Sequence, residues 1–160
     1  EGCGAVLIKP LSKAIHDGDH ILATINGTAV NQDGKSANLT SPNGPSQQAV
    51  IQTALQRAGI QSDDIDYIEA HGTGTPLGDP QEVEALNEVF SNNSIVVGAL
   101  KSNIGHLEAA SGIAGLIKTI LCLHQQTIPP NIHCSSLNEY LPDNNFIYPT
   151  NTIHNATPLD

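Results

Sequence analysis

Between Ile65 and Gln125 the chain alternates between short apolar runs of strand length and longer segments with helical periodicity. Four segments make up this pattern: strands at 65–70 and 95–100, and helices at 79–90 and 107–125. The order strand, helix, strand, helix predicts two parallel strands with helices packed on them. Asp79, Pro80 and Glu82 form a helix-start pattern, with Asp79 as N-cap, Pro80 in the first position and Glu82 completing a capping box.

The segment before Ile65 predicts further elements. Apolar residues at 5–8 and β-branched residues at 20–30 predict two strands that pair as a hairpin, with a brief helical turn between them at 11–16. Residues 31–44 read as a surface loop, and 45–58 as an amphipathic helix that ends at Gly59. In the Asn- and Pro-rich tail, only 146–148 resembles a strand.

Charge and composition exclude several function classes. The 160 residues carry a net charge of −10, which disfavours binding to nucleic acid. No apolar run reaches the length of a membrane span. The 3 cysteines are widely spaced, which favours a reducing, cytoplasmic location over a disulfide framework. The chain opens on Glu1 without a start Met or a targeting signal, and this suggests a chain cut from something longer.

Two loops follow the predicted strands at the edge of the sheet where ligands bind. The first, 71–78, contains His71, three glycines and the hydroxyls of Thr73 and Thr75. The glycines let the backbone approach a ligand closely, although a plain Gly-rich connection with an incidental histidine fits the residue types equally well. Neither a phosphate-binding nor a dinucleotide-binding glycine pattern is present.

The second loop, 101–106, leads from Lys101 to His106 at the expected start of the long helix. The positive end of a helix dipole disfavours protonation, so we expect His106 to be a neutral hydrogen-bond donor. Lys101 requires a carboxylate partner, and Glu108 is the nearest candidate. Because the first two helical turns contain mainly Ala, Ser and Gly, we expect the helix to be packed tightly and buried deeply.

Two neutral histidines from adjacent strand ends would form an electrophilic pocket for a carbonyl or enolate oxygen. A metal site would require a third ligand. The other histidines fall in turns, on a helix face or in the tail, so no metal site is expected; they are His16, His20, His124, His133 and His154.

The motifs around both histidines closely resemble the β-ketoacyl synthase family, specifically the ketosynthase domains of modular polyketide synthases. Residues 69–80 (EAHGTGTPLGDP) are similar to the family's first histidine motif, and 101–110 (KSNIGHLEAA) to its second. Residues 1–4, 29–34 and 42–45 also match in order and spacing, so that the resemblance extends to about Asn138.

This resemblance implies an α/β, thiolase-like layered fold with mixed sheets and a buried helix, of which the chain is an incomplete C-terminal portion. It implies decarboxylative Claisen condensation of an acyl thioester with a malonyl-type extender on acyl carrier protein, in polyketide or fatty acid biosynthesis. His71 and His106 match the catalytic histidines, and Lys101 matches the lysine that supports the second one. Thr73 and Thr75 match hydroxyls that contact the phosphopantetheine arm. No cofactor is expected to bind directly, and the complete domain is expected to be a homodimer.

The nucleophilic cysteine and the final Gly-rich loop of the family have no counterpart here, so residues 1–160 are interpreted as a partial domain, with 139–160 beginning a linker. Cys134 lacks the strand-to-helix elbow of a nucleophile. Cys122 is expected in the core, and Cys3 in strand packing.

Three interpretations of function remain open at this point. In the first, the chain is part of an acyltransferase and is inactive without its missing cysteine. In the second, it is a non-catalytic truncated or split half that acts as a binding or assembly module. The third is part of a homologue that decarboxylates without condensing.

Overall fold

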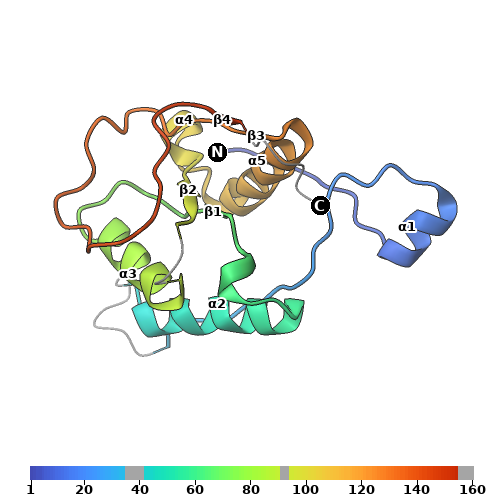
Figure 1. The fold of residues 1–160 in the computed structure, drawn as a ribbon, viewed down its shortest axis with the longest axis horizontal. Coiled ribbons are helices and arrows are strands. Elements are labelled where there is room, and N and C mark those ends of the chain that lie inside the picture. Colours follow the sequence, from blue (N-terminus) through green and yellow to red (C-terminus); the bar gives the residue numbers. More distant parts are fainter. Residues whose placement is uncertain (35–41, 91–93, 155–160) are drawn as a thin grey trace.

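Two short parallel strands form the centre of the molecule (Figure 1). The computed structural model describes residues 1–34, 42–90 and 94–154. In it, β1 (Tyr67–Glu69) pairs with β2 (Val96–Gly98), with Ile68 opposite Val97. Both strands are shorter than predicted, but the parallel strand–helix–strand unit is confirmed.

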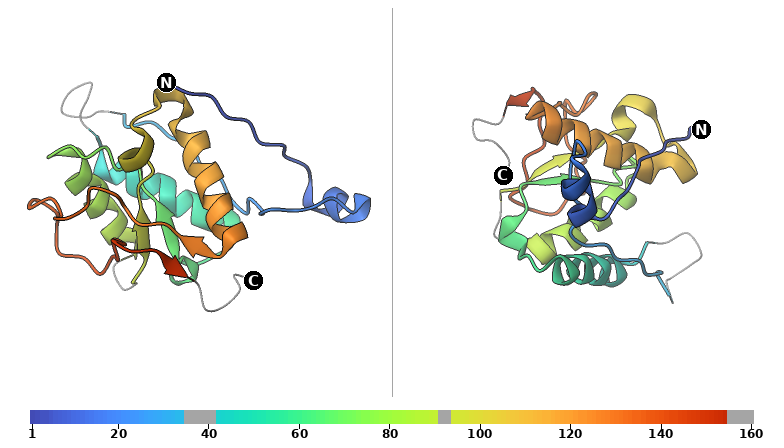
Figure 2. Two further views of the ribbon diagram at one scale, coloured as in Figure 1. Left: turned by 90° about the horizontal axis from the view of Figure 1, so that it is seen from above. Right: turned by 90° about the vertical axis from the view of Figure 1, so that its right-hand side faces the viewer.

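Helices cover both faces of this pair (Figures 1 and 2). One face is covered by α2 (Gly44–Ala58) and α3 (Gly78–Phe90), which pack on each other, and the other by α5 (Ser111–Gln125). Gly59 ends α2 in a left-handed conformation, as predicted. A single 3-10 turn, η1 (Ser62–Asp64), leads from α2 into β1.

Alternation along the strands separates an apolar face from a polar one. Ile68 and its partner Val97 face α3 and join the core; the buried members of this core are Val83, Leu86, Phe90, Ile95, Val97 and Phe146. Tyr67 and Glu69 face α5 instead, where Lys118 meets them. The strand pair is therefore held by burial on one side and by polar contacts on the other.

The C-terminal segment extends the sheet at the side of β2. Ile147 forms a parallel bridge with Val96, which confirms the weak strand expected at 146–148 as a single bridge. A second ladder joins β3 (Thr127–Ile128) to β4 (Ile153–His154) in antiparallel orientation and was not predicted. Its two-residue strands are too short for a periodic sequence signal.

The predicted N-terminal hairpin is wrong. Residues 1–30 form an arm that leaves the body near α5, turns at the tip through α1 (Leu11–Asp17) and returns to α2, with no strand in it (Figure 2). The helical turn at the tip is as predicted, and Gly18 ends it. Apolar side chains along the arm face solvent: Leu7 is 97% and Ile8 is 70% exposed. Half of the predicted loop at 31–44, residues 35–41, lies outside the described residues.

The long helix also differs from expectation. It begins at Ser111, after a short helix α4 (Lys101–Ile104) and a 3-10 turn η2 (Glu108–Ala110), so that a segment predicted as one loop and one helix is divided into three elements. Within α5 only Gly115 and Cys122 are buried, and Gly112 is exposed. The helix covers the sheet with one side only, so the expected deep burial is wrong for this chain. No helix in the described part of the chain is long and apolar enough to cross a bilayer.

Candidate active site

The two histidine loops meet at the carboxyl ends of β1 and β2, as predicted. The imidazole rings of His71 and His106 lie edge to face, with centroids 5.3 Å apart and an interplanar angle of 83°. Thirty-four residues separate them in the chain. The parallel pairing of β1 with β2 therefore brings the two rings to one place.

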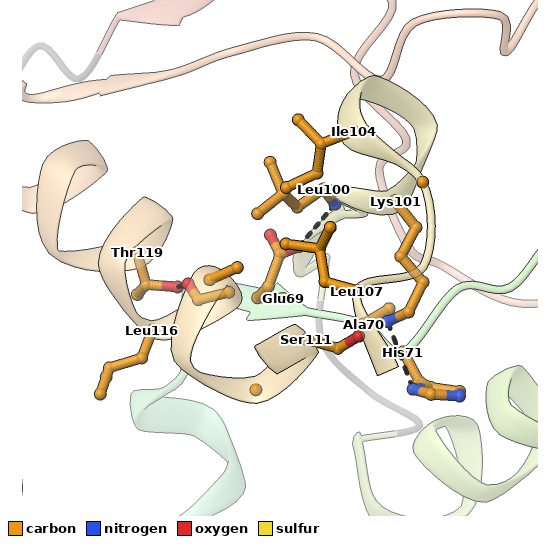
Figure 3. Close-up of a pocket in the computed structure, with 14 residues that line it drawn as sticks. Glu69, Ala70, His71, Leu100, Lys101, Ile104, Leu107, Ser111, Leu116 and Thr119 are labelled. Carbon is orange, nitrogen blue, oxygen red and sulfur yellow. Dashed lines mark hydrogen bonds between the residues drawn. The ribbon is translucent and has the colours of Figure 1, made fainter. Parts of the chain in front are cut away.

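Lys101 determines which nitrogen of His71 is available to a ligand. Its Nζ lies 3.3 Å from Nδ1 of His71 (Figure 3). An ammonium group can only donate, so Nδ1 accepts and the ring proton is on Nε2. Burial first, and then the charge of Lys101, lower the pKa of His71 below its ordinary value. His71 is thus a neutral ring that donates from Nε2.

The backbone of the first loop is held by Glu82 of α3. One carboxylate oxygen accepts from His71 N at 2.6 Å, and the other from Gly72 N at 2.8 Å. Gly72 has a φ of 47°, and a Cβ there would lie 2.9 Å from the Cβ of Ala99, so only glycine fits. The predicted capping box is therefore wrong: α3 begins at Gly78, Glu82 holds the loop, and Asp79 accepts from Gly74 N.

His106 presents the same nitrogen as His71. Its Nδ1 accepts from the backbone N–H of Glu108 at 2.9 Å, and Ser111 Oγ lies 3.0 Å from the same atom. Glu108 has a φ of 51°, in the left-handed region, and this turn aims its N–H at the ring. With Nδ1 accepting, a neutral His106 carries its proton on Nε2. In both rings Nδ1 is thus engaged and Nε2–H is left to donate. The predicted cause for His106, a position at the start of the long helix, is wrong, because α5 begins five residues later at Ser111.

Lys101 does not pair with Glu108, so that prediction is wrong. Lys101 is the first residue of α4, and its ammonium lies against His71, the first histidine, and not against the second one as the resemblance implied. Glu108 follows α4, Gly105 and His106 and begins η2. The two residues are close in sequence, but α4 and the turn at Gly105 separate them in space.

Two hollows meet at His71. One, of about 420 Å³, lies between the strand ends, α4 and α5, and His71 and Lys101 are part of its wall (Figure 3). The other, of about 660 Å³, lies toward α2 and α3 and is lined by Thr73 and Thr75. Thr75 Oγ1 accepts from Gly78 N and lies 3.5 Å from Thr73 Oγ1, so the two hydroxyls form a pair at the wall of this hollow. His71 thus lines both hollows, and the two predicted threonines line the second one.

Sequence reasoning missed a half-buried ionic cluster beside His71. Glu69 Oε2 lies 2.7 Å from Lys118 Nζ, and the two side chains are only 13% and 11% exposed. Tyr67 donates its hydroxyl to the same carboxylate, and burial raises the pKa of that phenol. A signal was present: a charge in a predicted buried strand and a single cation in an apolar helix each require a partner.

None of the three cysteines lines either hollow at His71. Cys122 is buried in α5 as expected, and burial raises the pKa of its thiol. Cys134 is half-buried in a loop that follows no strand-to-helix elbow. Cys3 is exposed, so its predicted packing role is wrong, because the arm that carries it forms no sheet.

Comparison with known proteins gives the family. Residues 22–135 match the family described as "Beta-ketoacyl synthase, C-terminal domain". The chain belongs to the β-ketoacyl synthase family. It is 50% identical over 141 residues to a phenolphthiocerol/phthiocerol polyketide synthase protein of Mycobacterium tuberculosis, covering 86% of this chain and 6% of that protein. It is 51% identical over 146 residues to the polyketide synthase PksM of Bacillus subtilis, covering 88% and 3%.

Solved structures agree with this assignment. The oxazolomycin ketosynthase domain OzmH KS7 of Streptomyces albus superposes with a TM-score of 0.89 at 38% identity, covering 95% of this chain and 28% of that one. For the ketosynthase from module 6 of the bacillaene synthase of Bacillus subtilis, the TM-score is 0.87 at 37% identity, covering 91% and 27%. The chain is thus a C-terminal portion of a thiolase-like ketosynthase domain of the modular polyketide synthase type, and it spans a small fraction of the length of its relatives.

Proposed function

We propose that this chain supplies the histidine half of a ketosynthase active site in polyketide biosynthesis, and that the nucleophilic cysteine comes from the preceding part of the domain. The observation that supports this most directly is the pair of neutral histidines, each with Nδ1 engaged and Nε2–H left to donate. Two such donors suit one oxygen on which negative charge develops.

In the proposed reaction a malonyl-type thioester on acyl carrier protein loses CO₂, and the electrons of the broken C–C bond move into the thioester carbonyl. His71 and His106 donate to the resulting enolate oxygen. The enolate carbon then attacks the acyl thioester on the cysteine, a C–C bond forms, and the C–S bond breaks as the thiolate leaves. Burial, and then the positive charge of Lys101, oppose a second proton on the His71 ring and so favour its neutral form.

Thr73 and Thr75 are proposed to donate to the phosphopantetheine arm that carries the extender. Their hollow opens beside His71, so an arm that enters there would place its thioester at the histidines. The acidic charge of this chain opposes docking of an acidic carrier protein on it alone. We therefore propose that the carrier-docking surface lies in other parts of the complete domain. We also propose that the complete domain is a homodimer.

Reconstitution tests this proposal. In a complete ketosynthase domain that contains this chain, His71→Ala and His106→Ala are each expected to lower the condensation rate about 100- to 1,000-fold, the usual cost of one oxyanion donor. Condensation and decarboxylation of malonyl carrier protein are followed separately by mass spectrometry. Near-normal rates in either variant would remove that histidine from the site.

The same assay separates the alternatives. The 160-residue chain alone is expected to form no β-keto product. A complete domain that loses CO₂ without forming the product would assign it to the decarboxylating class, and one that does neither would favour a binding or assembly module.

A further inference from the structure

The position of Lys101 depends on a very short piece of backbone. Strand β2 ends at Gly98, α4 begins at Lys101, and only Ala99 and Leu100 connect them. Within the described chain, these two residues lie beyond the strand pair and have no ladder partner that would fix their direction. The contacts that hold the Ala99–Leu100 backbone therefore affect the position of the Lys101 ammonium relative to His71.

Asn131, from the segment after β3, binds the strand side of the junction. Its Nδ2 donates to Val97 O at 3.0 Å, and its Oδ1 accepts from Ala99 N at 2.9 Å. The side-chain amide thereby satisfies one acceptor within β2 and the donor of the residue that follows it, as a neighbouring strand would. Asn131 is itself held, because its backbone N–H donates to Pro149 O at 2.8 Å.

Glu69, from β1, binds the helix side of the junction. Its Oε1 accepts from Leu100 N at 2.6 Å, while Lys118 neutralises the other oxygen (Figure 3 shows the bond to Leu100). Space for this buried group is made by Gly98, where a Cβ would collide with the Tyr67 hydroxyl oxygen and lie 2.9 Å from Lys118 Nζ. A half-buried carboxylate that is paired in this way acts as a fixed acceptor.

We propose that Asn131 and Glu69 are positioning residues that hold the Ala99–Leu100 junction from both sides and so keep the Lys101 ammonium against Nδ1 of His71. Neither residue touches the reacting atoms. Two side chains accept from adjacent backbone N–H groups, those of Ala99 and Leu100, immediately before the residue whose ammonium lies against His71 Nδ1. The importance of that contact for condensation rests on the function proposed above, but the contact itself does not.

The pKa of His71 reports on the charges around its ring, and a general loss of stability would not shift it in the direction expected here. Lys101 of α4 and the ring of His106 lower the pKa of His71, whereas Glu82 and Asp79 of α3 raise it. If the junction relaxes and Lys101 moves away, both carboxylates remain, since they hold the loop and α3 directly. The pKa of His71 then rises.

The test follows the imidazole of His71 by NMR titration of the histidine-labelled 160-residue chain. Asn131→Ala is expected to shift the midpoint upward, in the same direction as the reference variant Lys101→Met. The matched control is Asn87→Ala, which removes a side-chain bond from α3 to Asp143 O in the same tail but does not touch the junction. The control is expected to leave the midpoint unchanged. An unchanged midpoint in Asn131→Ala, or an equal shift in Asn87→Ala, would overturn the proposal.

A second pair of variants keeps the proposal testable if Asn131→Ala does not fold. Glu69→Gln with Lys118→Met retains an acceptor for Leu100 N and leaves no unpaired buried charge, whereas Glu69→Ala with Lys118→Met loses the acceptor. Only the alanine pair is expected to raise the His71 midpoint, and equal midpoints in the two pairs would contradict the role of Glu69.

Failure here is distinguishable from failure of the proposed function. The midpoint shifts are measured without substrate, so they stand even if His71→Ala leaves condensation intact in the complete domain. Conversely, a large loss of condensation in His71→Ala together with unmoved midpoints would keep the function and remove the positioning role.

Discussion

The body of this molecule and its N-terminal arm are built from similar apolar segments but differ in what those segments contact. In the body, Ile95 is fully buried between α3 and the C-terminal segment. In the arm, Leu7 lies in a similar apolar run and Val30 ends the β-branched segment 20–30, yet they are 97% and 94% exposed. Local sequence favours an extended backbone in both places, but only the body supplies the partners that turn it into a sheet.

The arm is nevertheless attached to the body at both of its ends. Near the start, Gly4 lies so close to α5 that a Cβ would be 3.0 Å from Ile113 Cγ2, and near the end Arg57 of α2 donates to Thr28 O at 2.9 Å. Between these attachments, the described residues leave the most exposed apolar side chains of the arm without cover. Under the proposed function, the preceding part of the ketosynthase domain would provide that cover.

The largest expected effect compares the same substitution in the two regions. Ile95→Ala is expected to lower the free energy of unfolding by about 2–5 kcal/mol, since it leaves a cavity in the core. Ile8→Ala, at a side chain that is 70% exposed, is expected to change it by less than about 0.5 kcal/mol. Urea unfolding of the 160-residue chain measures both.

An equal cost at Ile8 would contradict the comparison, because it would mean that the arm is packed. In a complete ketosynthase domain we expect the cost of Ile8→Ala to rise, and a cost that stays small there would show that the arm remains uncovered.

A smaller change in stability is expected when alanine replaces glycine at a tightly packed position and at an open one within the body. Gly98→Ala would place a Cβ within 2.9 Å of Lys118 Nζ and closer still to Tyr67, and overpacking of this kind costs about 1–3 kcal/mol. Gly112→Ala, in the first turn of α5, meets nothing within 4 Å and is expected to stabilise the chain by about 0.4–1 kcal/mol. The midpoint temperature of thermal unfolding should therefore fall in Gly98→Ala and rise in Gly112→Ala. A lower midpoint in Gly112→Ala would mean that the first turn of α5 is in contact with another part of the chain.

Sequence reasoning succeeded where local pattern and tertiary contact agree. The parallel unit, the end of α2 at Gly59 and the meeting of His71 with His106 all follow from periodicity, glycine conformation and strand direction. It failed where a contact crosses elements. Glu82 fits a capping box within its own helix equally well, and no local signal indicates that its carboxylate holds the backbone of another loop.

The same reason explains the missed junction. Asn131 lies in an Asn- and Pro-rich tail that reads as loop, and its role depends on the return of that tail along β2. The Lys101–Glu108 pairing failed in the opposite way, because nearness in sequence was taken for nearness in space although α4 and Gly105 lie between them.

The smallest expected effect is electrostatic and concerns the site itself. Burial and Lys101 lower the pKa of His71 in the folded chain, so between that value and the ordinary value near 6.5 the unfolded chain binds more protons. The contribution of His71 to stability is therefore complete above pH 6.5 and is lost as the pH falls toward the folded pKa.

Urea midpoints at pH 8 and pH 5.5 should accordingly differ less in His71→Gln than in the natural chain. Lys101→Met should reduce the difference as well, because the lysine charge is one cause of the lowered pKa. An unchanged difference in both variants would mean that the His71 ring is as free to take a proton in the folded body as in the unfolded chain.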